Sequence, residues 1–192
     1  MMKYIIPVML LAFTACNNAA EKQVQPVAET AEEKQRFFPV TAYLKGQIYD
    51  IKQKGLTPIK YTTVKEHTDS SMIQFEELET LAKEFLSPEI DSANLIDLYT
   101  ESKFLDQTIE AFTFTYEIKN TAPDSLQLLH WDVYIEPEKG KVKRIYMIKK
   151  AGAGKTLQLT WLSNKWFKTT TILNNADGSS SVEKEEKISW DY

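Results

Sequence analysis

The chain has few of the side chains that build metal centres and nucleophilic active sites. Among its 192 residues there is one cysteine, Cys16, and there are two histidines, His67 and His130. A single cysteine excludes a disulfide within the chain and a metal site built on several thiolates. The histidines do not have the spacing of a metal-binding pair on a helix, and the G-x-S-x-G and H-E-x-x-H motifs are absent. The common motifs of serine hydrolases and zinc proteases are therefore excluded.

A long hydrophobic run is also lacking. The apolar stretch at 4–13 has about ten residues, whereas a membrane span takes roughly twenty. It follows the positively charged Lys3 and precedes two small residues and then Cys16, which is the layout of a secretory signal peptide. We therefore predict that residues 1–15 form a signal peptide.

The end of this segment, FTAC, resembles the lipobox of bacterial lipoproteins. The resemblance implies that Cys16 is acylated, palmitate included, and becomes the first residue of the mature protein. Two or three acyl chains, at roughly 0.8 kcal/mol per buried methylene, anchor a protein stably to a membrane. Asn17 stands where some lipoproteins have the aspartate of inner-membrane retention, which favours the outer membrane of the cell envelope. A plain secretory signal cleaved near a cysteine is the alternative.

The chain after the cysteine divides into a polar segment and a longer apolar-patterned part. Residues 16–36 are polar and lack apolar periodicity, so we predict a lipidated cysteine followed by a disordered tether. Residues 37–192 number about 155, which suits a single globular domain with its own core.

Two segments have the apolar spacing of amphipathic helices. One covers 37–54, and the other covers 75–86, with expected caps at 69–71 and a stop at Pro88. From residue 109 onward the apolar period changes to two, and turn residues separate the runs. The pattern predicts an α+β fold, with an antiparallel meander sheet of five or six strands covered by two amphipathic helices. Residues 59–65 are predicted to form a further strand.

The hairpin at 131–148 has a second, local resemblance. Its sequence, WDVYIEPEKGKVKRIYMI, resembles the strand–turn–strand of PepSY-type and other small exported domains, in which a Pro-x-x-Gly turn joins two strands. The resemblance supports the meander topology and implies nothing about function.

The glycine-rich segment at 151–156 superficially matches a phosphate-binding loop. That loop requires a glycine at the position of Lys149, and it leads from a strand into a helix whose amides face the phosphates. Here Thr156 begins an alternating run typical of a strand. We predict a hairpin loop, and we expect neither a nucleotide nor another cofactor.

One local arrangement resembles an acid–base pair. His130 and Asp132 alternate onto one face of a predicted strand, beside Tyr134. Because the residues between them are apolar, this face is expected to be the polar one, where a solvated pair is the simpler interpretation. A small envelope hydrolase that uses carboxylates or this pair is the alternative function.

Charge is distributed unevenly along the chain. Residues 69–138 hold sixteen acids and three bases, whereas 139–173 hold nine bases and no acid. Either the basic residues form a face for an anionic partner, or they pair with the acidic strands within the sheet. The candidate anionic-partner surface consists of Lys141, Lys143, Lys149 and Lys168, the first three framing Ile145 and Met147 on one strand face.

These observations favour a non-catalytic envelope lipoprotein. Its expected partners are the membrane, through Cys16, and either an envelope protein or an anionic amphiphile. A purely structural or assembly role is a further alternative, and nucleic acid is not expected for an exported protein of net charge −4.

The anchor provides the first test. The Cys16→Ser variant is expected to leave the membrane fraction or to remain unprocessed, because the acylated sulfur is lost. Fractionation followed by mass spectrometry of the mature N-terminus measures both outcomes. An unlipidated mature N-terminus at another residue would refute the prediction.

Overall fold

The computed structural model describes residues 37–91, 95–152 and 154–190. The first range holds helix α1 (Val40–Gln53), strands β1 (Ile59–Val64) and β2 (His67–Met72), and helices α2 (Phe75–Leu81) and α3 (Lys83–Leu86). The second range begins with the short 3-10 helix η1 (Ile96–Leu98). Seven strands follow: β3 (Tyr99–Asp106), β4 (Ala111–Ile118), β5 (Leu128–Ile135), β6 (Val142–Lys150), β7 (Lys155–Leu162), β8 (Trp166–Asn174) and β9 (Ser180–Ser189).

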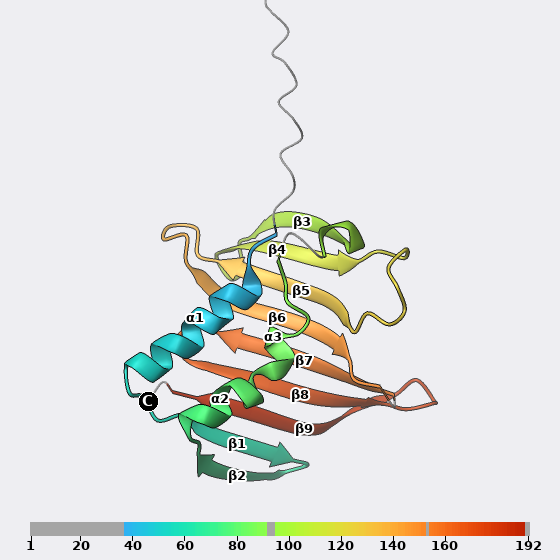
Figure 1. Cartoon of the computed structure of the whole chain (residues 1–192). Coiled ribbons are helices and arrows are strands. Elements are labelled where there is room, and N and C mark those ends of the chain that lie inside the picture. Colours follow the sequence, from blue (N-terminus) through green and yellow to red (C-terminus); the bar gives the residue numbers. More distant parts are fainter. Residues whose placement is uncertain (1–36, 92–94, 153, 191–192) are drawn as a thin grey trace, which may run out of the picture. The chain divides into compact units, whose positions relative to one another are not determined.

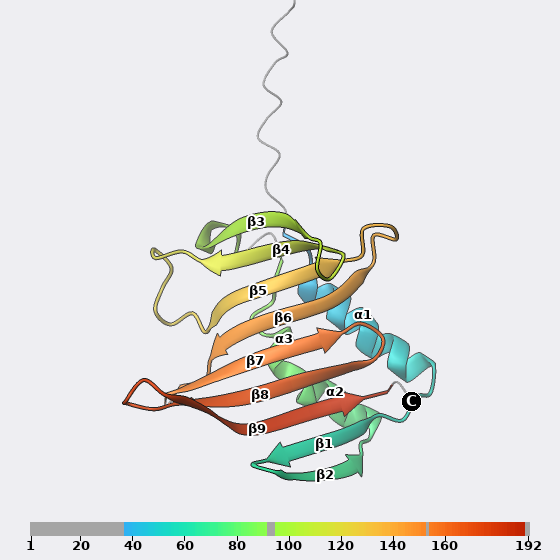
Figure 2. The ribbon, with the colours of Figure 1, turned by 180° about the vertical axis from the view of Figure 1, so that it is seen from behind.

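All nine strands belong to one antiparallel sheet. Its order is β2-β1-β9-β8-β7-β6-β5-β4-β3, so the last strand pairs with the first and places Ile188 opposite Lys60. The helices lie over one face of the sheet (Figure 1). The view from behind shows no helix over the opposite face (Figure 2). We call these the helix-covered face and the open face.

The predicted fold, a five- or six-stranded meander covered by two helices, was wrong. The sheet has nine strands, and the second predicted helix is divided into α2 and α3, of seven and four residues. The unpredicted strands β2 and β3 form the two edges, where every residue of β2 is exposed and Tyr99 alone is buried in β3. An edge strand pairs on one side only and needs no continuous apolar row. Residues 69–71, expected as helix caps, belong to β2.

Two aromatic clusters fill the helix-covered face. In the first, Trp131 stacks on Tyr116 at 4.5 Å between ring centroids, and Phe37 closes the cluster at 5.5 Å from Trp131. In the second, Trp161 stacks on Phe167 at 4.7 Å, and Phe85 from α3 meets Trp161 edge-on at 5.5 Å. Aromatic pairs of this kind contribute about 0.5–1.5 kcal/mol beyond their buried area. The clusters therefore hold the start of α1 and the end of α3 against the sheet.

A buried lysine joins α3 to strand β6. Lys149 is 2% exposed, and its Nζ donates to Oε2 of Glu84 at 2.6 Å, to the carbonyl of Glu84 at 3.0 Å and to the carbonyl of Ser87 at 2.8 Å. All three ammonium hydrogens therefore have acceptors. Two of these acceptors are backbone carbonyls at the C-terminal end of a helix, where a cation is favourable.

This contact predicts a large effect on stability. The Lys149→Met variant should lose about 3 kcal/mol of unfolding free energy, because two backbone carbonyls and Glu84 lose their donor. The neighbouring Lys150 is exposed and serves as a matched control. Lys150→Met should change the unfolding free energy by less than about 0.5 kcal/mol. Urea unfolding measures both, and equal effects in the two variants would contradict the role of Lys149.

Candidate functional site

The structure separates the four lysines that were grouped from the sequence. Lys141 and Lys143 lie at the start of β6, at one end of the sheet. Lys149 is buried under α3, and Lys168 lies on the open face, with its Nζ 2.8 Å from Oε1 of Glu185. The apolar residues expected between the lysines, Ile145 and Met147, belong to the core. The four lysines therefore do not form one surface, and Cys16 lies outside the described residues.

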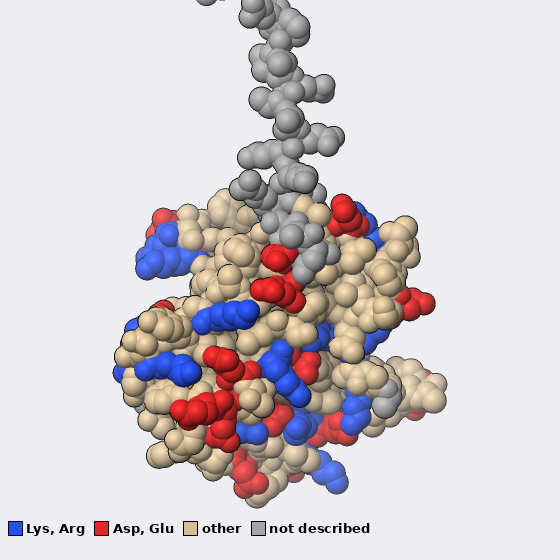
Figure 3. All heavy atoms as spheres, in the orientation of Figure 1, with Lys and Arg blue, Asp and Glu red and all other residues tan. Residues whose placement is uncertain are grey.

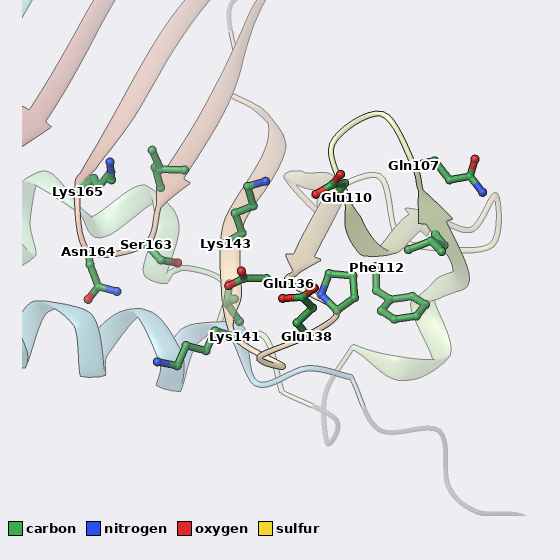
Figure 4. Close-up of a pocket in the computed structure, with 14 residues that line it drawn as sticks. Gln107, Glu110, Phe112, Glu136, Glu138, Lys141, Lys143, Ser163, Asn164 and Lys165 are labelled. Carbon is green, nitrogen blue, oxygen red and sulfur yellow. The ribbon is translucent and has the colours of Figure 1, made fainter.

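A cleft occupies the end of the sheet where Lys141 and Lys143 lie. Its volume is about 910 Å³, and it is bounded by the β3–β4, β5–β6 and β7–β8 turns with the strand ends beside them (Figure 4). We call it the end cleft. It is lined by Leu105, Gln107, Glu110, Phe112, Glu136, Pro137, Glu138, Lys141, Val142, Lys143, Leu162, Ser163, Asn164 and Lys165.

Helix α1 positions the β7–β8 turn that forms one wall of the end cleft. The hydroxyl of Tyr43 donates to Oγ of Ser163 at 2.8 Å, and the backbone N–H of Asn164 donates to Oε1 of Gln47 at 2.8 Å. Asn164 has φ 62°, a left-handed conformation that asparagine tolerates in tight turns. The position of this wall therefore depends on the packing of α1 onto the sheet.

The end cleft combines charges of both signs with apolar surface. Lys143 donates from Nζ to the carbonyl of Ile109 at 3.0 Å, which links β6 to the β3–β4 turn. Figure 4 shows Glu136 and Glu138 between Phe112 on one side and Lys141 and Lys143 on the other. A hydrogen bond from Lys139 at 2.8 Å is the main reason that the pKa of Glu136 lies below its usual value.

The apolar part of the end cleft comes from the edge hairpin. Leu105 and Phe112 are opposite each other across β3 and β4, and they are 49% and 46% exposed. Exposed apolar side chains next to charged ones are typical of surfaces that bind another molecule.

Sequence reasoning missed every residue of the end cleft except Lys141 and Lys143. One usable signal was present, because every second turn of an antiparallel meander lies at the same end of the sheet. That signal would have grouped the β5–β6 and β7–β8 turns. The β3–β4 turn stayed hidden because β3 was not recognised as a strand.

The second set of candidate residues lies on the open face. His130 Nε2 is 3.0 Å from Oδ2 of Asp132, and the hydroxyls of Thr115 and Tyr134 donate to the same carboxylate at 2.6 and 3.1 Å. Asp132 is 7% exposed, and Nδ1 of His130 lies 4.0 Å from a carboxylate oxygen of Glu117. The alternation of strand β5 thus brings together the pair that the sequence singled out.

The electrostatics of this cluster follow from its hydrogen bonds. The bond to Asp132 raises the pKa of His130, against the opposing effect of partial burial. Burial raises the pKa of Asp132, but the hydrogen bonds from His130, Thr115 and Tyr134 outweigh it and leave this pKa below its usual value. The carboxylate is therefore fully engaged in contacts within its own face.

The contacts of His130 in the described residues can be compared with those that hydroxyl or metal catalysis needs. Within the described ranges, His130 has no serine or threonine hydroxyl as a hydrogen-bond partner, and no group of three or more His, Cys, Asp or Glu side chains could hold a metal ion. Covalent catalysis by a hydroxyl needs such a contact between nucleophile and base.

The glycine-rich segment at 151–156 leads from β6 into β7. Nζ of Lys155 lies 2.7 Å from Oε2 of Glu183, so this lysine already pairs with a carboxylate of strand β9. Strands β6 and β7 pair with each other on either side of this segment, and the element that follows it is a strand.

Comparisons with known proteins identify no relative. No family model matches the chain, and no curated protein or solved structure is significantly similar to it. Among the described helices, none has the length and apolar character to cross a membrane.

The His130–Asp132 contact predicts a pH dependence of stability. Because the folded-state pKa of His130 is raised, its stabilising contribution is complete below its unfolded pKa of about 6.5 and is lost as the pH rises through the folded pKa. Between pH 6 and 8, the wild-type protein should therefore lose unfolding free energy that the His130→Gln variant does not lose.

Urea unfolding at a series of pH values measures this difference. The chain offers a matched control, since His67→Gln removes the other histidine and keeps His130. The control should retain the wild-type pH dependence. The same dependence in His130→Gln would contradict the assignment.

Proposed function

We propose that this protein is an exported, non-catalytic lipoprotein of the cell envelope that binds another envelope protein through the end cleft. The signal-peptide pattern before Cys16 supports the export and the lipid anchor, and Asn17 supports the outer membrane. The observation that carries the binding role is the end cleft, in which exposed apolar side chains lie next to charges of both signs.

The chemistry of the end cleft favours a protein over an anionic amphiphile. Lys141 and Lys143 could attract an anionic headgroup, but Glu110 and Glu138 line the same cleft and would repel it. A protein segment carries both signs of charge and apolar side chains, so it can match all three parts of this lining. Figure 3 also shows acidic and basic side chains intermixed over the helix-covered face.

The His130–Asp132 cluster supports a binding or structural role more than hydrolysis. Asp132 is held by three side chains of its own face, and no nucleophile accompanies His130 in the described residues. The proposal therefore assigns no catalytic residue.

Site-specific photo-crosslinking in intact envelopes tests the proposal. A photoreactive phenylalanine analogue in place of Phe112 should form a discrete crosslink to a protein. Adding the Lys141→Glu substitution, which reverses one exposed charge in the end cleft, should reduce that crosslink to background. The Lys141→Glu change should alter the unfolding free energy by less than about 0.5 kcal/mol, because the side chain is exposed.

The same analogue in place of Tyr49 is the control. Tyr49 lies on α1, is 61% exposed and does not line the end cleft. The expected result is a protein crosslink at Phe112 that is absent at Tyr49. Equal crosslinks at both positions, no crosslink at Phe112, or a crosslink to lipid alone would overturn the proposed protein partner.

A further inference from the structure

Strand β3 forms the longer of the two edges of the sheet. It has eight residues and follows β4 at the end of the strand order, whereas β2 at the opposite edge has six. Both views show β3 along one border of the sheet, on the far side from β2 (Figures 1 and 2). An edge strand presents backbone groups that can pair with another strand.

The direction of these backbone groups follows from one hydrogen bond. The carbonyl of Leu98, just before β3, accepts from the N–H of Lys119, just after β4, at 2.9 Å. In an antiparallel pair the residues that hydrogen bond to the neighbouring strand alternate with those that face away from it. The residues whose N–H and C=O groups face away from β4 are therefore Tyr99, Glu101, Lys103 and Leu105.

The side chains at this edge combine apolar surface with both signs of charge. Phe104 and Leu105 lie on opposite faces of β3 and are 51% and 49% exposed. A lysine in the middle of an edge strand usually discourages another strand from pairing with it. Here Nζ of Lys103 lies 2.6 Å from Oε1 of Glu101, two residues away on the same face. A strand that carries both charges can match a second copy of itself.

We propose that β3 pairs antiparallel with β3 of a second copy of the chain, about a two-fold axis at Ser102. In this register Glu101 of each copy lies opposite Lys103 of the other, and Thr100 lies opposite Phe104. The contact is the same on both copies, as a two-fold interface requires. It joins two nine-stranded sheets into one continuous sheet.

The charges of β3 select this register from its neighbours. Continuing the sheet keeps the helix-covered faces of both copies on one side, so the axis passes through a residue. An axis at Glu101 or at Lys103 would place two like charges directly opposite each other, which destabilises a sheet. An axis at Phe104 would place Lys103 opposite Leu105. Only the axis at Ser102 pairs opposite charges.

The other edge of the sheet does not offer this match. Strand β2 has one side chain of fixed charge, Asp69, so a second copy of β2 has no opposite fixed charge to place beside it. Its one large apolar side chain is Met72, at the end of the strand. Of the two edges, β3 is therefore the one whose sequence is complementary to itself.

The proposed dimer is independent of the partner proposed for the end cleft. Leu105 is the one β3 residue that also lines the end cleft, and the charged residues of the cleft belong to other segments. Failure of the dimer would therefore leave the end cleft proposal standing, and the reverse also holds.

Disulfide trapping of the full chain in intact envelopes tests the pairing. In the Ser102→Cys variant the two introduced thiols lie opposite each other at a position without backbone hydrogen bonds, where the Cα atoms of a strand pair are about 4.5 Å apart. That separation suits a disulfide. Oxidation with copper phenanthroline should therefore give a dimer that a reducing agent splits.

The matched control is Ser70→Cys, the same change at an exposed position of the other edge strand. It should stay monomeric under the same oxidation. The wild-type chain, whose single cysteine is Cys16, gives the background.

A mixed experiment tests the register. Thr100→Cys alone and Phe104→Cys alone should give no dimer, because equivalent positions lie about 14 Å apart across the axis, too far for a disulfide. The two variants expressed together should crosslink to each other. Adding Ser102→Lys to both chains places two lysines directly opposite and should reduce that crosslink about fivefold or more. Ser70→Lys, the same change on β2, should leave it unchanged.

Four results would overturn the proposal. They are no dimer from Ser102→Cys, an equal dimer from Ser70→Cys, a crosslink from Thr100→Cys alone that equals the mixed one, and an equal loss with Ser70→Lys and Ser102→Lys. A disulfide between Ser102→Cys and a different protein would also overturn it and would assign the β3 edge to that protein. The cysteine variants introduce no charge, so their outcome stands even if Ser102→Lys fails to fold.

Discussion

The packing of α1 and α3 onto one face of the sheet determines which surfaces of the sheet stay accessible. Trp131 and Trp161 each form the centre of an aromatic cluster, and Phe37 and Phe85 bring the helices to those clusters. Lys149 adds a buried ionic contact that holds the end of α3 in place. Because the helices occupy this face, the opposite face and the ends of the strands are left for other molecules.

The packing of α1 also positions part of the end cleft. Helix α1 contacts the β7–β8 turn through Tyr43 and Gln47, so the helix that covers the core also sets one wall of the end cleft. The other walls come from the β3–β4 and β5–β6 turns, which Lys143 and Ile109 join. Residues far apart in the sequence are therefore positioned by side-chain hydrogen bonds to the turns, two of them from one helix.

The open face holds contacts between side chains of neighbouring strands that stabilise the fold. Asp132 is fully engaged by His130, Thr115 and Tyr134, so this part of the face serves the fold. Lys187 faces Lys168 directly across β8 and β9, and the two charges are offset by Glu185, 2.8 Å from Lys168, and by the ring of Trp166 beside Lys187.

The sequence by itself determined the local pattern of the chain, and the tertiary structure decided which side of the pattern is accessible. Alternation correctly placed His130 beside Asp132, and it placed Lys149 on the same strand face as Ile145 and Met147. It did not reveal that the helices cover that face. We therefore predicted Lys149 on the surface, whereas the structure buries it and leaves only 2% of it exposed. The edge strands β2 and β3 escaped recognition because an edge needs no apolar row, and without β3 the end cleft had no third wall. Side-chain periodicity is a property of neighbouring residues, whereas burial depends on which distant element packs against them.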